Sequence, residues 1–175
     1  MRLLDLFCGA GGAGMGYHRA GFEVVGVDSK PQKHYPFEFH QADAFAFLEQ
    51  HGHEFDVIHA SPPCQAYSVM SRQENGHPDL YGKTRDILEA IGHPWIIENV
   101  INAPYRWGTV LCGSMFGMVV QRHRNFETSW MILSSLRCDH TGARPKTVTG
   151  KGGGTSAHSD KGIKTEWPLY MQMPW

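Results

Sequence analysis

Apolar positions in this chain recur in two patterns that alternate along its first hundred residues. Short apolar runs predict strands, and apolar residues spaced three or four apart predict helices. The strands are expected at residues 2–7, 22–27, 37–40, 55–60 and 95–97. The helices are expected at residues 12–20, 44–51 and 84–91. Strands that alternate with helices in this way indicate an α/β fold with a mostly parallel sheet.

Two segments interrupt this regularity. Residues 66–82 are polar and contain Asn75, Gly76 and Pro78, and a connection of that length is typical of a functional loop. After Phe126 the periodicity fades, and residues 142–162 hold six glycines. We interpret this second segment as a flexible basic loop of the same domain.

Composition supports one globular domain and limits the class of protein. The chain has 175 residues, of which 41% are apolar and 19% charged. The formal net charge is −1, but residues 1–60 carry a net charge of −4 and residues 142–164 one of +4. This asymmetry suggests two different ligands. The sequence shows neither a secretion signal nor an apolar run long enough for a membrane span, so we expect a cytoplasmic protein without a membrane partner.

The four cysteines do not form a recognisable framework. Cys8, Cys64, Cys112 and Cys138 are far apart and include no Cys-x-x-Cys pair, which argues against structural disulfides and a zinc ribbon. Cys138 lies close to His140, but a structural zinc needs about four ligands and no second pair stands nearby in the sequence. We therefore expect no metal site.

A glycine-rich turn points to a nucleotide-type cofactor. After the first strand the chain reads Gly9-Ala10-Gly11-Gly12-Ala13-Gly14, and Asp28 follows at the end of the next strand. Glycines let the backbone approach a ligand closely, and a carboxylate in that place can accept both ribose hydroxyl protons. Nicotinamide dinucleotides and S-adenosylmethionine both suit this geometry. Asp43 could accept from an adenine amino group or cap the following helix.

Two further residues point to covalent chemistry. Cys64 follows the strand at 55–60 in Ser61-Pro62-Pro63-Cys64-Gln65, so its thiol should project from the carboxyl edge of the sheet. The polar loop behind it favours an accessible nucleophile over a structural cysteine. Glu98 ends the strand at 95–97, which should place a possible acid in the same cleft.

Four motifs together resemble a known family. They are, in chain order, Asp5-Leu6-Phe7-Cys8-Gly9-Ala10-Gly11-Gly12, Ser61-Pro62-Pro63-Cys64-Gln65, Glu98-Asn99-Val100 and Arg122-His123-Arg124. In this order they closely resemble the DNA (cytosine-5) methyltransferases, in particular the compact bacteriophage and bacterial members. The resemblance covers residues 3–127, and short matches to the late part of the family follow at residues 144–148 and 171–175.

The resemblance implies a fold, a reaction and partners. It implies a Rossmann-like methyltransferase fold, with catalysis and cofactor binding in residues 1–127. Residues 128–175 would form a reduced target-recognition region of the same domain, and we expect the closing C-terminal segment of the family to be lacking. The implied reaction moves a methyl group from S-adenosylmethionine to carbon-5 of a flipped-out cytosine in double-stranded DNA. The family further implies restriction-modification, a bacterial host cytoplasm and a monomer.

The resemblance also assigns roles to residues. Cys64 would attack the base, Glu98 would hold and protonate ring nitrogen 3, and Arg122 and Arg124 would steady the base and favour the thiolate. The cofactor would contact Phe7, Gly9, Gly11, Gly12, Asp28, Asp43 and Pro62. The DNA would contact Gln65, Ser68, Arg72, Arg144, Lys146 and Lys151.

One motif departs from the family pattern, which is Gln-x-Arg-x-Arg. Here Gln121 directly precedes Arg122, so an alignment on the glutamine would replace both arginines by His123 and Asn125. We align on the arginines, because Phe126 then falls on the aromatic strand that follows in the family. Three alternatives remain open from the sequence: an inactive relic that binds cofactor and DNA, an RNA substrate, and a nicotinamide-dependent oxidoreductase.

Overall fold

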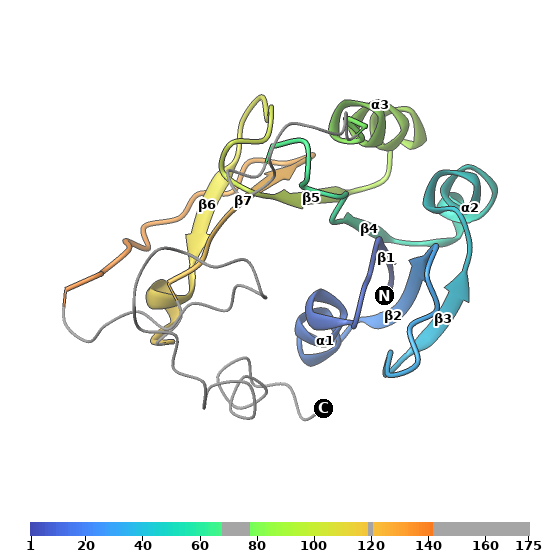
Figure 1. Cartoon of the computed structure of the whole chain (residues 1–175), viewed down its shortest axis with the longest axis horizontal. Helices are drawn as coiled ribbons and strands as arrows, with labels where there is room; N and C mark the ends of the chain where they lie inside the picture. Colours follow the sequence, from blue (N-terminus) through green and yellow to red (C-terminus); the bar gives the residue numbers. More distant parts are fainter. Residues whose placement is uncertain (68–77, 119–120, 142–175) are drawn as a thin grey trace.

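The protein is described by a computed structural model over residues 1–67, 78–118 and 121–141. These residues form one seven-stranded sheet with the strand order β3-β2-β1-β4-β5-β7-β6 (Figure 1). The strands are β1 Arg2–Leu6, β2 Glu23–Asp28, β3 Glu38–Gln41, β4 Val57–Ala60, β5 Trp95–Asn99, β6 Thr109–Cys112 and β7 His123–Thr128.

The direction of the strands confirms the expected α/β architecture. Strands β1 to β5 pair in parallel, whereas β7 is antiparallel to both of its neighbours, β5 and β6. The order in which strands are added to the sheet reverses at β1, since β2 and β3 lie on one side of it and β4 and β5 on the other. Open sheets of this kind bind ligands at the carboxyl ends of the strands near such a reversal.

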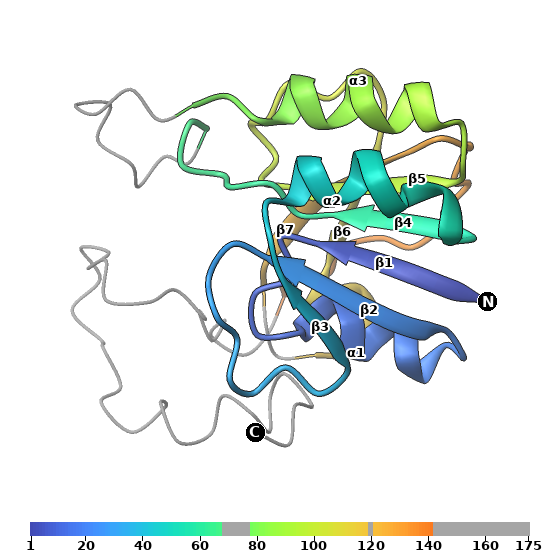
Figure 2. The same cartoon turned by 90° about the vertical axis from the view of Figure 1, so that its right-hand side faces the viewer.

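Helices cover both faces of the sheet. Helix α1 (Gly12–Arg19) lies on one face, and α2 (Ala44–His51) and α3 (Tyr81–Ile91) lie side by side on the other (Figures 1 and 2). Two short 3₁₀ turns, η1 (Gly52–Glu54) and η3 (Gly113–Phe116), follow α2 and β6. None of the helices in the described ranges is long and apolar enough to cross a bilayer.

Alternating side chains in the strands build a core on each face. Leu4 and Leu6 of β1 pack under α2 and α3, in the larger cluster of buried residues. Leu3 belongs to the smaller cluster beside α1, where Tyr17 packs against it. Strands buried on both faces explain why the sequence reads as continuous apolar runs at these positions.

The structure departs from the expected elements in two places. Helix α3 begins at Tyr81, so the predicted loop 66–82 is shorter than expected at its carboxyl end. Strand β6 was not predicted at all, and a strand at β7 was expected only from the family resemblance around Phe126. Strand β7 carries polar side chains towards both faces, which removes the alternation that sequence patterns depend on.

Candidate active site

The candidate catalytic residues meet at one edge of the sheet. Because β1, β4 and β5 are parallel, the turn after β1, the loop after β4 and the end of β5 share the carboxyl edge. These segments carry Gly9, Cys64 and Glu98 respectively. The placement of all three at this edge was predicted from the sequence and is confirmed by the strand pairing.

The glycine turn leaves room for a ligand. Gly9 and Gly11 have φ angles of 50° and 87°, a conformation that side chains rarely adopt. A Cβ atom added at Gly9 would have nothing within 4 Å, so this part of the turn faces open space. Helix α1 begins at Gly12, directly behind the turn.

Asp28 lies at the end of β2, beside this turn. Its Oδ2 accepts the backbone N–H of Gly9 at 3.0 Å, and its Oδ1 accepts the backbone N–H of Lys30 at 2.9 Å. A carboxylate offers about four lone-pair positions, so two further hydroxyl groups can be bound. The open turn and the fixed carboxylate therefore fit the ribose of a nucleoside cofactor.

The other predicted cofactor residues are Phe7, Asp43 and Pro62, and they make different contacts. Phe7 has a φ of 57° and packs edge-on against Phe45, with 5.7 Å between the ring centroids. Asp43 caps helix α2, because its Oδ1 accepts the backbone N–H groups of Phe45 and Ala46, both at 3.0 Å. The helix-cap interpretation of Asp43 is thus confirmed, and its contact with adenine stays a prediction, as does that of the buried Pro62 with the cofactor.

Sequence reasoning missed Tyr35, whose ring packs against the glycine turn at Gly11. A Cβ atom at Gly26 would lie 2.3 Å from the ring of Tyr35, so only glycine fits in β2 at this point. The Tyr35 hydroxyl donates to Oδ2 of Asp5 at 3.3 Å. Burial and the negative charge of Asp5 raise the pKa of Tyr35, which keeps it a hydrogen-bond donor. A glycine inside a strand pattern was the available signal.

A second buried group that the sequence did not reveal links β1 to β4. The Nδ1 atom of His59 lies 2.9 Å from Oδ1 of Asp5, and both side chains are almost completely buried. The other ring nitrogen of His59 lies 3.4 Å from the hydroxyl of Ser61, the first residue of the loop that carries the cysteine. This chain of polar contacts fixes the loop where it leaves the sheet.

The loop around Cys64 is held on its other side by β5. The Asn99 side chain donates to the carbonyl oxygen of Pro62 at 2.9 Å, and the backbone N–H of Tyr67 donates to the carbonyl oxygen of Cys64 at 3.0 Å. The Cys64 side chain itself is partly exposed. The cysteine is therefore presented on a rigid turn and remains accessible.

Glu98 and two arginines complete the site. The Nε atom of Arg124 lies 2.7 Å from Oε1 of Glu98, and each side chain keeps less than a quarter of its surface exposed. The Arg122 side chain still reaches solvent, yet partial burial and the neighbouring Arg124 lower its pKa, while Glu98 and Cys64 act in the opposite direction. The pKa of Arg122 thus responds to both the carboxylate and the thiol.

This geometry favours the alignment on the arginines. Strand β7 directs Arg124 to the face on which Glu98 lies. Residues one position away point to the opposite face, where Glu127 of the same strand meets helix α3. His123 and Asn125, the residues that an alignment on Gln121 would select, therefore do not face Glu98.

The remaining cysteines differ from Cys64. Burial, together with the charge of Asp5, raises the pKa of Cys8 far above its ordinary value. Burial also acts to raise the pKa of Cys112, but hydrogen bonds with Ser114 and His140 outweigh it and lower this pKa to about 6. Cys112 ends β6, three strands away from β4, and Cys138 lies next to Ser114 just after it. Of the four thiols, Cys64 is the one on the loop that follows β4, the strand paired with β5 and its Glu98.

Two expectations need a separate comment. Among the predicted DNA-binding residues, Gln65 has an exposed side chain next to Cys64, and its DNA contact stays a prediction. The others lie outside the described residues: Ser68, Arg72, Arg144, Lys146 and Lys151. The expectation of no metal site assumed that Cys138 and His140 have no second pair nearby. No such pair is near them in the sequence, but folding brings Cys112 and His123 to them.

Comparison with known proteins adds independent information. A family model described as C-5 cytosine-specific DNA methylase matches residues 1–103. The Type II methyltransferase M.HgiDI of Herpetosiphon aurantiacus is 33% identical over 119 residues, which cover 59% of this chain and 38% of that protein. M.HgiGI of the same organism is 32% identical over 119 residues, and the match covers 59% of this chain and 93% of that shorter protein.

A solved structure supports the fold. The methyltransferase EhMeth of Entamoeba histolytica superposes with a TM-score of 0.54 at 18% identity, over 73% of this chain and 52% of that one. The expected Rossmann-like methyltransferase fold is thereby confirmed.

Proposed function

The chain belongs to the C-5 cytosine-specific DNA methylase family, and from this premise we propose that it methylates carbon-5 of cytosine in double-stranded DNA. The methyl donor would be S-adenosylmethionine, bound at the glycine turn. The family membership argues against the nicotinamide-dependent alternative, which rested on the glycine motif alone.

One observation carries this proposal: a cysteine on a rigid turn shares the carboxyl edge with a carboxylate that an arginine holds. Cys64 supplies the nucleophile, and Glu98 lies on the adjacent parallel strand with its Oε1 bound to Arg124 at 2.7 Å. Arg122, two residues before Arg124, adds a second positive charge that interacts electrostatically with both groups. A positive charge beside a thiol favours the thiolate, which is the nucleophilic form.

The proposed reaction begins with attack by Cys64. Its thiolate adds to carbon-6 of cytosine, and the electron pair that is displaced moves through the ring to nitrogen 3, which Glu98 protonates. Carbon-5 then has enamine character and can attack a methyl group, whose bond to sulfur would break so that its electron pair stays on the departing thioether. S-adenosylmethionine supplies that electrophilic methyl group when bound. Water then removes the proton on carbon-5, the electron pair of that C–H bond expels Cys64 as a thiolate, and nitrogen 3 returns its proton to Glu98.

The proposed roles of the charged residues follow from their contacts. Because Arg124 binds Oε1 of Glu98, Oε2 is the oxygen that would reach the edge of the base. This contact also fixes the rotation of the carboxyl group before the base arrives, so less order has to be created in the transition state. The Asp28 carboxylate would bind the ribose of the donor, and Phe7 would cover its sulfonium.

Access to carbon-6 requires that the cytosine leave the base stack, at a cost of a few kcal/mol. We propose that Gln65, next to the nucleophile, and Ser68 and Arg72 fill the gap and hold neighbouring phosphates. Arg144, Lys146 and Lys151 would add phosphate contacts, so affinity should fall as salt rises. A restriction-modification role, a bacterial host cytoplasm and a monomeric state complete the proposal.

Methyl transfer from radiolabelled S-adenosylmethionine to duplex DNA tests this proposal directly. The expected result is acid-precipitable label in duplex DNA that contains cytosine, none in duplexes in which 5-methylcytosine replaces every cytosine, and none with Cys64→Ser. His53→Ala serves as the control, because it removes an exposed polar side chain of the η1 turn, outside the site, and should retain transfer.

Two outcomes would contradict the proposed activity. Binding of S-adenosylmethionine without transfer to any duplex would favour the inactive relic. Transfer to RNA in preference to DNA would show that RNA is the substrate.

A further inference from the structure

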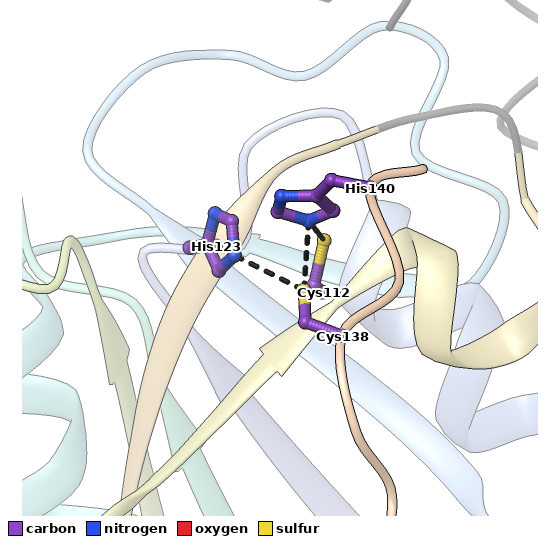
Figure 3. Close-up of side chains that lie close together, drawn as sticks. All are labelled: Cys112, His123, Cys138 and His140. Carbon is purple, nitrogen blue, oxygen red and sulfur yellow. Dashed lines mark hydrogen bonds between the residues drawn. The ribbon is translucent and has the colours of Figure 1, made fainter. Parts of the chain in front are cut away.

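Four potential metal ligands gather at the end of the sheet that is farthest from the cofactor turn. Cys112 is the last residue of β6, and His123 is the first residue of β7, directly opposite it in the strand register. Cys138 and His140 come from the segment after β7 and complete the group (Figure 3). All four ligand atoms lie within 4.8 Å of one another.

The individual separations suit a common central ion. The sulfur of Cys138 lies 2.8 Å from Nε2 of His140 and 3.2 Å from Nε2 of His123. The sulfur of Cys112 lies 3.5 Å from the same nitrogen of His140. In a tetrahedral zinc site with Zn–S of about 2.3 Å and Zn–N of about 2.0 Å, ligand atoms are about 3.3 to 3.8 Å apart. Small shifts of the side chains would satisfy this geometry.

Hydrogen bonds among these four side chains are too weak to explain why they come together. Sulfur is a poor hydrogen-bond partner, yet two sulfurs and two imidazole nitrogens converge here from three different segments. The one carboxylate in the segment, Asp139, is engaged elsewhere, since it accepts from the backbone N–H and the hydroxyl of Thr141. The donor set is therefore two thiols and two imidazoles without a carboxylate.

We propose that Cys112, His123, Cys138 and His140 bind one zinc ion as a structural site. Two thiolates and two imidazoles form a typical tetrahedral zinc set, and four protein ligands close the site to water and substrate. On binding, each cysteine releases its thiol proton to solvent and donates a sulfur electron pair to the metal.

The position of the site suggests what the metal stabilises. Residues 129–141 have no regular secondary structure, and Met131 and Leu133 are 80% and 89% exposed. A zinc ion would fasten this segment to the β6–β7 hairpin through Cys138 and His140. It would also fix His123, whose neighbours in the sequence are Arg122 and Arg124 of the candidate active site.

Metal content of the purified full-length chain tests the proposal without reference to methyl transfer. Protein from zinc-supplemented cells, purified without chelator, should contain about one zinc per chain by plasma mass spectrometry. Cys138→Ser and His140→Ala should each lower this content at least fivefold. Both residues lie outside the helices and strands, so their variants should fold. Cys64→Ser and His53→Ala are the matched controls and should keep the wild-type content.

Cobalt gives a second measurement that needs no variant. Metal-free wild-type protein titrated with Co²⁺ should develop the intense ligand-field bands of tetrahedral coordination and a thiolate charge-transfer band, and both should saturate at one equivalent. Wild-type protein that binds neither metal under reducing conditions would overturn the proposal. Equal zinc in Cys138→Ser and in Cys64→Ser, or a disulfide between Cys112 and Cys138 under those conditions, would also overturn it.

Discussion

Replacing Arg124 by methionine should slow methyl transfer and leave the fold intact. The substitution keeps most of the apolar stem and removes the guanidinium that lies 2.7 Å from Oε1 of Glu98. The two side chains are 24% and 21% exposed, so the contact is largely shielded from solvent. A hydrogen bond between charged groups in such surroundings contributes about 1.5 to 3 kcal/mol. If that contribution is made in the transition state, the rate should fall about 10- to 150-fold.

The chain contains a matched pair that should behave differently. Arg106 and Glu89 form a contact of nearly the same length, 2.9 Å, but their side chains are 49% and 38% exposed. Exposed ion pairs contribute about 0 to 1 kcal/mol, and Glu89 lies in α3, away from the active site. Arg106→Met should therefore keep the rate within about twofold of wild type.

Single-turnover transfer of a radiolabelled methyl group, with enzyme in excess over DNA, provides the rate of the chemical step. Thermal unfolding of each variant shows that a slow rate does not come from unfolded protein. A rate for Arg124→Met within threefold of wild type would refute the role of this contact. Equal losses of rate in Arg124→Met and Arg106→Met would refute it as well, because the loss would then follow from removing any positive charge and not from this contact.

Three further changes test other parts of the structure. Asp28→Ala should weaken binding of S-adenosylmethionine by about 1.5 to 3 kcal/mol in calorimetry, and unchanged affinity would exclude the ribose contact. Glu127→Gln should lower the free energy of unfolding in urea by about 3 to 5 kcal/mol, because it leaves the buried Arg85 without the negative charge that lies 3.0 Å away; a loss below 1 kcal/mol would contradict this. Gly26→Ala should cost about 1 to 3 kcal/mol, since its Cβ would lie 2.3 Å from the Tyr35 ring, and a stable variant would show that the ring can move.

The sequence predicted those parts of the fold in which an apolar strand is directly followed by residues of the candidate site. Strands β1, β2 and β4 are buried on both faces, so their apolar runs were recognisable, and the glycine turn and Cys64 follow directly from two of them. Glu98 was predicted at the carboxyl edge because it directly follows the expected strand at 95–97. Because these strands were expected to be parallel, the residues that follow them were expected at the same edge of the sheet.

The parts that the sequence did not predict depend on contacts between distant segments. Asp5 and His59 are polar residues inside apolar strands, and nothing local shows that each is the partner of the other. Cys112 and His123 are eleven positions apart and become neighbours only through the pairing of β6 with β7. Spacing rules for metal sites read ligands along the chain, so they found Cys138 and His140 and missed the other pair.

The central claim is that Cys64 forms a covalent bond with the target base. Duplex DNA that carries 5-fluorocytosine should trap this bond in the presence of S-adenosylmethionine, because fluorine at carbon-5 cannot leave as a proton and elimination stalls. We expect a complex that survives denaturing electrophoresis, with the modified peptide mapped to Cys64 by mass spectrometry. Cys64→Ser should form none, and Glu98→Gln should form it roughly 10² to 10⁴ times more slowly, as for a lost general acid. An adduct at Cys8, Cys112 or Cys138, or undiminished trapping by Cys64→Ser, would contradict the mechanism.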